Sequence, residues 1–378
     1  MVGTGQQGWR RFFAFGFQEA GLLFVILVLG ALLTIFGGSV EVPVIRTTPD
    51  GERQRVFITN AQGEEEPLLE KRNKFLNAQN LAQLAKDTSF IAIMAVGATI
   101  VIISGGIDLS VGAIYALASV AGALVLNRYG GEGAGAGSAG MLGVFFGMLA
   151  CIGTGALCGL GNGAMIVALR VHPFIITLGT MAIFRGIAFV KTQGQSIGGF
   201  PEAFREMIQF RVGNDLSLVP LGVMLVVTIA GAVFLARLAA GRRVYAIGGN
   251  ELASRYSGIR VERVKLLVFF LSGLTAGISA LLSIGYYGAA TSGDGQGYEL
   301  NVIAAAVVGG ASLSGGKGSA LGALLGALII QMINSGIVIL RIDQNYSQII
   351  VGAVVIVAVV LDQVNGWIAR KRMASASV

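Results

Sequence analysis

The stretch FIAIMAVGATIVIISGGIDLSVGAIYALASVAGALVL (residues 90–126) contains a single carboxylate, Asp108, between two apolar runs. An unpaired charge at the centre of a bilayer costs about 2.5–3.5 kcal/mol on insertion scales, so its position needs a physical reason. Gly105 and Gly106 precede it and let the chain turn at low steric cost. At a helix start, a carboxylate accepts hydrogen bonds from unpaired backbone N–H groups and faces the positive end of the helix dipole. We therefore expect Asp108 at the start of a helix.

The composition indicates a polytopic membrane protein. Of the 378 residues, 54% are hydrophobic and 12% are charged, which is about half the charged fraction of a soluble protein. The apolar residues fall into blocks of about 17–25 residues, the length of a transmembrane helix. A soluble protein with a very apolar core would not need so many blocks of this length. No small-residue cleavage site follows the first apolar run, so we expect the first span to be retained.

Ten apolar segments are predicted to be helices, because a lipid-exposed chain must satisfy its own backbone hydrogen bonds. They lie near residues 20–38, 88–104, 108–126, 140–169, 173–191, 217–237, 264–288, 299–312, 318–340 and 346–362. The eighth is short and flanked by glycine-rich stretches, so we expect it to span only part of the bilayer. The predicted fold class is an all-α polytopic membrane protein with about ten transmembrane helices.

Lysine and arginine residues predict the orientation, because they concentrate on the cytoplasmic side. One face receives Arg10, Arg11, Arg170, Arg237, Arg242, Arg243, Arg255, Arg260, Arg263, Lys265, Lys317, Arg370, Lys371 and Arg372. The short segments of the other face hold Arg128, Lys191, Arg205, Arg211 and Arg341. We therefore expect both termini in the cytoplasm of a cell whose plasma (inner) membrane holds the chain. The net charge of +7 lies in these short segments, which argues against a nucleic-acid partner.

Residues 41–87 form a polar insertion that we expect on the outer face. VPVIRTTPDGERQRVFIT (42–59) predicts a β-hairpin, since two alternating runs flank a Pro-Asp-Gly turn. NKFLNAQNLAQLAKD (73–87) predicts a short amphipathic helix lying at the interface before the second span. The predicted organisation is a first span with its cytoplasmic N-terminus (1–40), this insertion, a membrane core (88–362) and a cytoplasmic tail (363–378).

Two pairs of similar strings suggest an internal repeat. GIDLSV (106–111) is similar to GYELNV (297–302), and NGAMIVALRV (162–171) is similar to NSGIVILRI (334–342). Five predicted spans separate the first pair, and this odd number places the two strings in opposite orientations. Spans 2–5 and 7–10 are therefore predicted to form an inverted repeat, an arrangement found in transporters.

The polar side chains in or beside the spans are the candidate pathway residues. They are Asp108, Ser110, Asn162, Glu299, Asn301 and Asn334. Two interpretations stay open: such residues cap or connect helices by hydrogen bonds, or they contact a solute. For Asp108 and Glu299 the two roles are compatible, because a capped, broken helix also presents polar groups to a solute.

The sequence contains no recognisable arrangement of catalytic residues. Cys151 and Cys158 lie seven residues apart in an apolar run and are expected to pack between helices. The only histidine, His172, is expected at a helix start near the interface, a proton relay being the alternative. The glycine-rich GGASLSGGKGS (309–319) fails the phosphate-loop pattern at two positions. We therefore predict no catalytic residue, no metal site and no nucleotide site within this chain.

Three strings resemble a known family. AIMAVGATIVIISGGIDLSVGAIYALASVAGAL (92–124), YAIGGNELASRYSGIRVERVKLLVFFLSGLTAGISALL (245–282) and GYELNVIAAAVVGGASLSGGKGSALGALLGALI (297–329) resemble ribose-type ABC importer permeases, the membrane subunits for pentoses, galactose and related solutes. The likeness covers roughly residues 75–362. The insertion departs from the pattern, because the first external loop of that family is usually much shorter.

The resemblance implies an ATP-driven importer that moves a small polar solute by alternating access. Two permease subunits, identical or paired, would form the pathway in the lipid bilayer, a solute-binding protein would deliver the solute, and a cytoplasmic ATPase would bind ATP and magnesium. The long basic segment 237–265 would be the coupling segment. Its candidate contact residues are Gly248, Gly249, Asn250, Glu251, Ala253, Arg255 and Gly258, with Asn250 capping a short helix that ends at Gly258.

Two other functional classes remain. An ion-coupled secondary transporter would suit an inverted repeat with broken helices equally well, with Asp108 or Glu299 at its ion site. Few acidic residues lie within the spans, which argues against it. An intramembrane enzyme would need a nucleophile, base or metal site that the spans do not offer. The sequence leaves the identity of the solute open.

Overall fold

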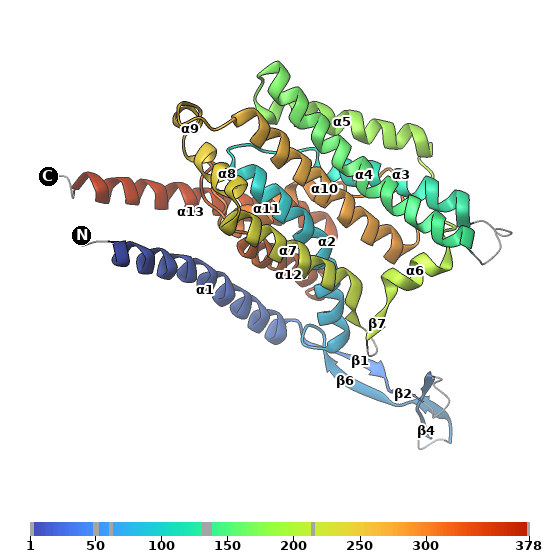
Figure 1. Cartoon of the computed structure of the whole chain (residues 1–378). Coiled ribbons are helices and arrows are strands. Elements are labelled where there is room, and N and C mark those ends of the chain that lie inside the picture. Colours follow the sequence, from blue (N-terminus) through green and yellow to red (C-terminus); the bar gives the residue numbers. More distant parts are fainter. Residues whose placement is uncertain (1–3, 48–52, 60–62, 131–137, 213–215, 376–378) are drawn as a thin grey trace.

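The computed structural model describes residues 4–47, 53–59, 63–130, 138–212 and 216–375 as a bundle of helices with a narrow β-structure at one end (Figure 1). The helices are α1 (Thr4–Phe36), α2 (Ala78–Ile103), α3 (Val111–Gly130), α4 (Ser138–Leu169), α5 (Pro173–Thr192), α6 (Glu202–Gln209), α7 (Leu218–Arg237), α8 (Ala239–Gly249), α9 (Glu251–Tyr256), α10 (Val261–Tyr287), α11 (Tyr298–Val308), α12 (Ala320–Ile339) and α13 (Ser347–Ser375). A short 3-10 helix (Gln344–Tyr346) precedes α13.

The polytopic all-α fold is confirmed. Within the described residues, eight helices are long and apolar enough to cross a membrane. Two shorter apolar segments are α11 and residues Gln344–Val360, which include the 3-10 helix and the first part of α13. Each of the ten predicted apolar segments corresponds to one of these helices. The 11 residues of α11 measure about 16 Å, a length equal to about half of the hydrocarbon core. The predicted short helix is therefore present.

Helix α2 is the centre of the bundle. Every residue from Thr88 to Ile103 is buried, and α2 contacts α7, α10, α11 and α12. Helix α10 runs antiparallel to it, because Tyr287 at the end of α10 lies beside Lys86 near the start of α2, with 3.3 Å between the Tyr287 hydroxyl oxygen and Lys86 Nζ. The two helices that begin the proposed halves therefore lie in opposite orientations.

The helix contacts follow the order expected for an inverted repeat. Helix α4 packs on α10 as α12 packs on α2, and α3 packs on α10 as α11 packs on α2. Within each half, α3 contacts α4 and α5, while α11 contacts α12 and α13. This correspondence supports the predicted pairing of spans 2–5 with spans 7–10.

Small residues allow α4 and α10 to pack closely. A Cβ atom at Gly155 or Gly159 would overlap backbone atoms of α10, at Gly273 and Phe269 respectively. A Cβ at Gly273 would in turn overlap Gly155 O. The four-residue spacing of these glycines therefore serves packing within the chain, as small residues do in membrane helices. Cys151, one of the two cysteines, is buried at the same contact.

The β-structure is a three-branched arm, which is larger than the hairpin that the sequence predicted. It contains three antiparallel pairs: β1 (Ser39–Pro43) with β6 (Leu69–Asn73), β2 (Ile45–Thr47) with β3 (Arg53–Arg55), and β4 (Phe57–Thr59) with β5 (Glu65–Pro67). The β2–β3 pair confirms the predicted hairpin strands, while the Pro-Asp-Gly turn lies outside the described residues.

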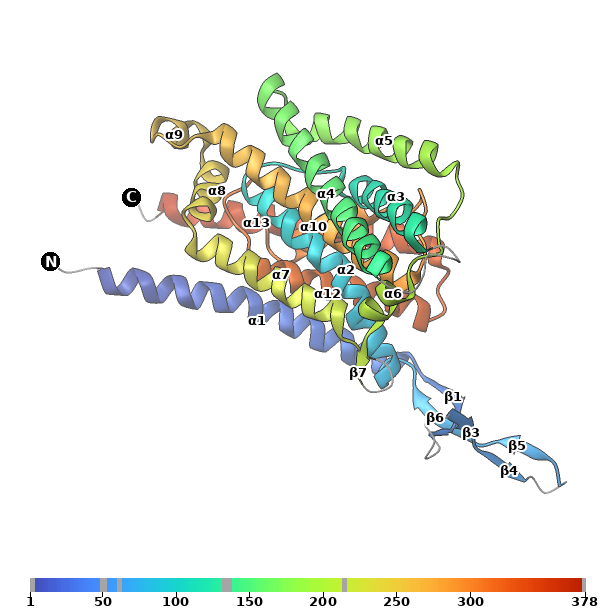
Figure 2. The same ribbon diagram turned by 45° about the vertical axis from the view of Figure 1, so that its right-hand side comes forward.

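The three branches meet at a ring of backbone hydrogen bonds. Val44 N donates to Leu68 O at 2.8 Å, Val56 N donates to Val44 O at 2.9 Å, and Leu68 N donates to Val56 O at 2.8 Å. At the root, Lys74 N donates to Gly38 O at 3.0 Å, so the chain enters and leaves the arm at one point. The arm projects from the end of the bundle opposite α8 and α9 (Figure 2).

The predicted interfacial helix before the second span is wrong. Residues 78–87 are the first turns of α2, which continues without a break to Ile103. Phe75 and Leu84 are buried in a cluster with Leu33 of α1 and Met332 of α12. An apolar stripe that the sequence assigned to the lipid interface therefore packs against protein. No glycine or proline interrupts residues 78–96, so no helix-breaking residue separates the predicted interfacial helix from the second span.

Other boundaries also differ from the prediction. Helix α3 begins at Val111 rather than at 108, because residues 104–110 are not helical. Helix α13 continues through Ser375, so most of the predicted tail is helical. The short helices α6 and α8, and the strands β7 (Arg211–Val212) and β8 (Leu216–Ser217), were not anticipated. They lie in the connections between the spans, which the apolar-block criterion does not detect.

We predict that Gly159→Ala lowers the stability of the bundle by about 1–3 kcal/mol, because the added methyl group forces α4 away from α10. The matched control is Gly161→Ala on the same helix, where a Cβ would have no neighbour within 4 Å. Thermal denaturation in detergent, followed by fluorescence-detected size-exclusion chromatography, measures both. Equal melting temperatures for the two variants would contradict the packing described here.

Candidate functional site

Asp108 lies in the non-helical segment 104–110 between α2 and α3, where it is 2% exposed. Its Oδ1 accepts hydrogen bonds from Ser110 N at 3.0 Å and from Ser110 Oγ at 2.6 Å. Its Oδ2 accepts one from Ser272 Oγ of α10 at 2.8 Å. Asn162 of α4 extends the network, because its Nδ2 donates to Ser110 Oγ at 2.8 Å. The carboxylate therefore joins the start of α3 to α4 and α10.

Hydrogen bonds from neighbouring side chains and from the backbone itself also satisfy the polar backbone groups of this break. Thr177 Oγ1 of α5 donates to Ile107 O at 3.2 Å. Gly106 N and Ser104 N donate to carbonyl oxygens in the last turn of α2. His172, predicted at a helix start, is the N-cap of α5, and its Nδ1 accepts a hydrogen bond from Phe174 N at 3.3 Å. The break is thus held by protein groups on several sides.

Glu299 lies in the first turn of α11, at the second break (residues 288–297). Its Oε1 accepts a hydrogen bond from Gly297 N at 3.3 Å, and its Oε2 is buried without a partner among the described residues. A Cβ at Gly112 of α3 would overlap this Oε2, so the starts of α3 and α11 meet. The Tyr115 and Tyr298 rings also contact each other there in a tilted arrangement, with 5.4 Å between their centroids. Asp108 and Glu299 belong to separate clusters.

Arg185 of α5 secures the second break. Its Nη1 donates to Ser292 O at 2.9 Å and to Asp294 O at 2.5 Å. The Asp294 carboxylate accepts hydrogen bonds from Thr291 N and Thr291 Oγ1. Ala290 forms a backbone bridge with Ile197. This non-helical segment therefore also obtains its hydrogen bonds inside the protein.

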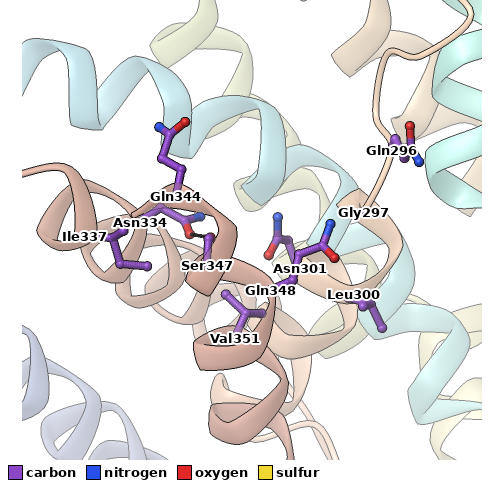
Figure 3. Close-up of a pocket in the computed structure, with 10 residues that line it drawn as sticks. All are labelled: Gln296, Gly297, Leu300, Asn301, Asn334, Ile337, Gln344, Ser347, Gln348 and Val351. Atoms are coloured by element: carbon purple, nitrogen blue, oxygen red, sulfur yellow. Dashed lines mark hydrogen bonds between the residues drawn. The ribbon is translucent and has the colours of Figure 1, made fainter. Parts of the chain in front are cut away.

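Asn301 and Asn334 line a cavity of about 300 Å³ between α11, α12 and α13 (Figure 3). Asn334 Oδ1 accepts a hydrogen bond from Ser347 Oγ at 2.9 Å. Asn301 and Gln348 lie at the centre of the view in Figure 3. The remaining lining consists of Gln296, Gly297, Leu300, Ile337, Gln344 and Val351. The cavity lies toward the arm, because α12 ends beside Gly37 at the arm root.

A larger cavity of about 710 Å³ lies at the other end of the bundle. The break after α2, the end of α4, the start of α5, and helices α9 and α10 surround it. Its lining is charged and includes Arg170, Glu251, Arg255, Glu262 and Lys265. The start of α1 and the end of α13 lie on this side of the bundle in Figures 1 and 2.

The predicted coupling residues surround the junction of α8 and α9. Asn250 is the N-cap of α9, and its Oδ1 accepts a hydrogen bond from Ala253 N at 2.9 Å, as the sequence predicted. Gly258 follows α9 with a φ of +82°, a conformation that favours glycine. Gly248 and Gly249 end α8. Glu251 and Arg255 are exposed on α9, toward the larger cavity.

The structure thus brings the predicted residues together in separate groups. Asp108, Ser110 and Asn162 form one cluster, whereas Asn301 and Asn334 line the smaller cavity. Sequence reasoning missed Ser272 and Arg185, which lie in apolar runs without a distinguishing motif. It also missed Gln344, Ser347 and Gln348. The polar string DQNYSQ (343–348), placed directly before the last span, was the signal that could have identified them.

A family model described as the permease component of a branched-chain amino acid transport system matches residues 80–359. The chain belongs to this permease family. The match includes both breaks, both cavities and the α8–α9 segment.

Curated relatives identify the branch of the family. The ribose import permease RbsC of Escherichia coli (strain K12) is 38% identical over 295 residues, which cover 76% of this chain and 87% of the relative. RbsC of Bacillus subtilis (strain 168) is 39% identical over 76% of this chain and 86% of the relative. The D-allose permease AlsC of Escherichia coli (strain K12) is 36% identical, with coverage of 76% and 85%. No solved structure matches.

These comparisons confirm the predicted resemblance to ribose-type permeases of ABC sugar importers. They indicate a transport subunit of an integral membrane complex rather than an enzyme. The β-structured part of the arm, which ends at Asn73, lies outside the residues that the permease model matches.

We predict that Asp108→Ala lowers permease stability by at least about 2 kcal/mol, because three buried donors lose their acceptor. Ser272→Ala removes one of these bonds and is expected to cost about 1 kcal/mol. Thr228→Val is the control, since the buried Thr228 hydroxyl has no partner among the described residues. Melting temperatures in detergent should decrease in the order T228V, S272A, D108A. A D108A melting temperature equal to that of T228V would show that the network does not hold α3 in place.

Proposed function

We propose that this permease is the membrane-spanning subunit of an ATP-driven importer for a monosaccharide or a similar small polar solute. It receives the solute from a solute-binding protein on the outer side, and it operates by alternating access. The observation that carries the proposal is the position of α8 and α9, which contact the inner ends of both halves of the bundle. In this orientation α8, α9 and both termini face the cytoplasm, and the arm faces outward.

A junction of glycines fixes α8 to the bundle. A Cβ at Gly248 would overlap Ile103 O at the end of α2. Gly316 N donates to the same Ile103 O at 2.8 Å, and Gly315 lies against Gly248. Tyr245 Oη of α8 donates to Gly318 O at 2.7 Å. Burial raises the pKa of Tyr245 still further above neutrality, so its hydroxyl is a donor throughout the physiological pH range. Displacement of α8 therefore also displaces α2 and the α11–α12 connection.

Ion pairs fix α9 to the start of α10. Lys265 Nζ donates to both carboxylate oxygens of Glu251, at 3.0 and 2.9 Å. Arg255 Nη1 lies 2.9 Å from Glu262 Oε1. These side chains are partly exposed, so each pair contributes at most about 1 kcal/mol to stability. Their main effect is to orient the helices, because two ion pairs restrict the rotation of α9 relative to α10.

A continuous path of contacts connects α9 with the Asp108 network. Helix α10 carries Glu262 and Lys265 at its start and Ser272 further along. Ser272 Oγ donates a hydrogen bond to Asp108. Asp108 also accepts one from the backbone N–H of Ser110, the residue directly before α3. A shift of α10 that follows α9 therefore acts on the break between α2 and α3. This is the mechanism by which we expect a cytoplasmic partner to change access to the pathway.

The energy source is a separate cytoplasmic ATPase, which would bind ATP and magnesium. The glycine-rich connection 309–319 lacks the phosphate-loop pattern and instead packs against α8. Two permease subunits, identical or paired, would complete the pathway. The family relationship favours this function over an ion-coupled secondary transporter.

Reconstitution tests the energy source. The permease is purified from its native membrane together with associated proteins, reconstituted in vesicles, and supplied with radiolabelled D-ribose or D-allose. We expect an ATPase and a solute-binding protein to copurify, and uptake to require ATP and to resist a protonophore. Uptake that a protonophore abolishes and that ATP depletion leaves intact would instead identify a secondary transporter.

We predict that Gly248→Ala lowers ATP-driven uptake at least about tenfold, because a methyl group at this position separates α8 from α2. Gly249→Ala is the matched control, since a Cβ there has no neighbour within 4 Å. Uptake is compared at equal amounts of assembled complex. If G248A transports as well as G249A, the glycine junction does not transmit the movement.

A further inference from the structure

We infer that the 300 Å³ cavity between α11, α12 and α13 is a solute-binding site for a neutral, polyhydroxylated molecule of monosaccharide size. This inference rests on the proposed transport function and assigns a position and a set of ligand groups to the solute. We call this cavity the amide cavity, after the five carboxamide residues in its lining: Gln296, Asn301, Asn334, Gln344 and Gln348.

The hydrogen-bonding groups of the amide cavity are available. Asn334 is paired with Ser347, whereas the side chains of Gln296, Asn301, Gln344 and Gln348 have no hydrogen-bond partner among the described residues. Each carboxamide carries two N–H donors and one carbonyl acceptor. The Gln348 amide also lies close to Gly297 at the start of α11, where a Cβ would be 3.7 Å from Gln348 Nε2.

This set of groups matches hydroxyl groups. A hydroxyl donates one hydrogen bond and accepts others, and a carboxamide offers both complements in one side chain. The lining contains no aspartate, glutamate, lysine, arginine or histidine. The lining therefore offers a charged solute no counter-charge, whereas it offers several donors and acceptors to hydroxyl groups. The chemistry therefore selects a neutral polyol or sugar.

The size and the lining also fit a small solute. Ligand sites in proteins measure about 300–1,000 Å³, so this volume is suited to a small molecule. Leu300, Ile337 and Val351 add apolar surface beside the amides, as the C–H faces of a sugar ring require. The amide cavity lies near the end of α12 that adjoins the arm, the side from which the solute would be delivered.

Protection from labelling tests the site without requiring ATP. Leu300→Cys places a thiol in the lining and leaves every carboxamide in place. Membrane vesicles with the full chain are labelled with a membrane-impermeant maleimide in the presence of D-ribose, D-allose or ribitol at millimolar concentration. The charged comparison probes are D-ribonate, D-ribose 5-phosphate and D-glucosamine. The unsubstituted chain gives the background from Cys151 and Cys158.

We expect at least one neutral probe to slow the labelling of L300C severalfold, and no charged probe to do so. Val338→Cys is the control for access, because Val338 is 57% exposed on α12 and does not line the amide cavity. Gln348→Leu in the L300C background should raise the protecting concentration about tenfold, the equivalent of one lost hydrogen bond. Gln195→Leu, an exposed glutamine outside the amide cavity, should leave it unchanged.

Three outcomes would overturn the inference: no probe protects L300C, charged probes protect it as well as neutral ones, or Q348L leaves protection unchanged. The proposed function fails separately, through uptake that does not depend on ATP. Loss of protection with intact ATP-driven uptake rejects only the site, and protection with ATP-independent uptake rejects only the energy source.

Discussion

Every polar backbone group inside a bilayer must find its partner within the protein, and the rest of this structure depends on that requirement. Continuous helices meet it by themselves. The described chain nevertheless departs from helical geometry at two prominent breaks, residues 104–110 and 288–297. At the first break, Asp108 accepts from Ser110 and Ser272, and at the second, Arg185 donates to two backbone carbonyls. These side chains satisfy non-helical backbone within the protein, and they gather polar groups at both breaks.

Two cavities lie near opposite ends of the bundle, and each is lined by the break, the long helix and the last helix of one half. The amide cavity lies beside α11, the end of α12 and the start of α13. The larger, charged cavity lies beside the break that leads into α3, the end of α4 and the start of α5. Under the inverted repeat these are equivalent positions. The charged cavity differs because α9, which has no counterpart in the first half, contributes Glu251 and Arg255, and because Arg170, Glu262 and Lys265 also line it.

Much of the fold could be predicted from the sequence because membrane helices have a strong signal. All ten apolar segments are helical, and the short α11 and the capping by Asn250 were foreseen from local composition. The error at residues 73–87 has a specific cause. An amphipathic stripe is the same whether its apolar face meets lipid or protein, and only the tertiary contacts of Phe75 and Leu84 distinguish the two. The candidate site was harder to predict. Its residues come from distant segments, so Ser272 has no signal of its own. Gln344, Ser347 and Gln348 became candidates only when α12 and α13 were seen together.

The single entry point of the arm has a practical consequence. Lys74 N donates a hydrogen bond to Gly38 O, so the two ends of the insertion lie side by side at the root of the arm. The ring of bonds among Val44, Val56 and Leu68 then closes the branches upon themselves. The backbone hydrogen bonds that join the branches of the arm therefore form within the insertion itself. An epitope or a fluorescent domain inserted in one of its branches would report the sidedness of the membrane without disturbing the path taken by the helices.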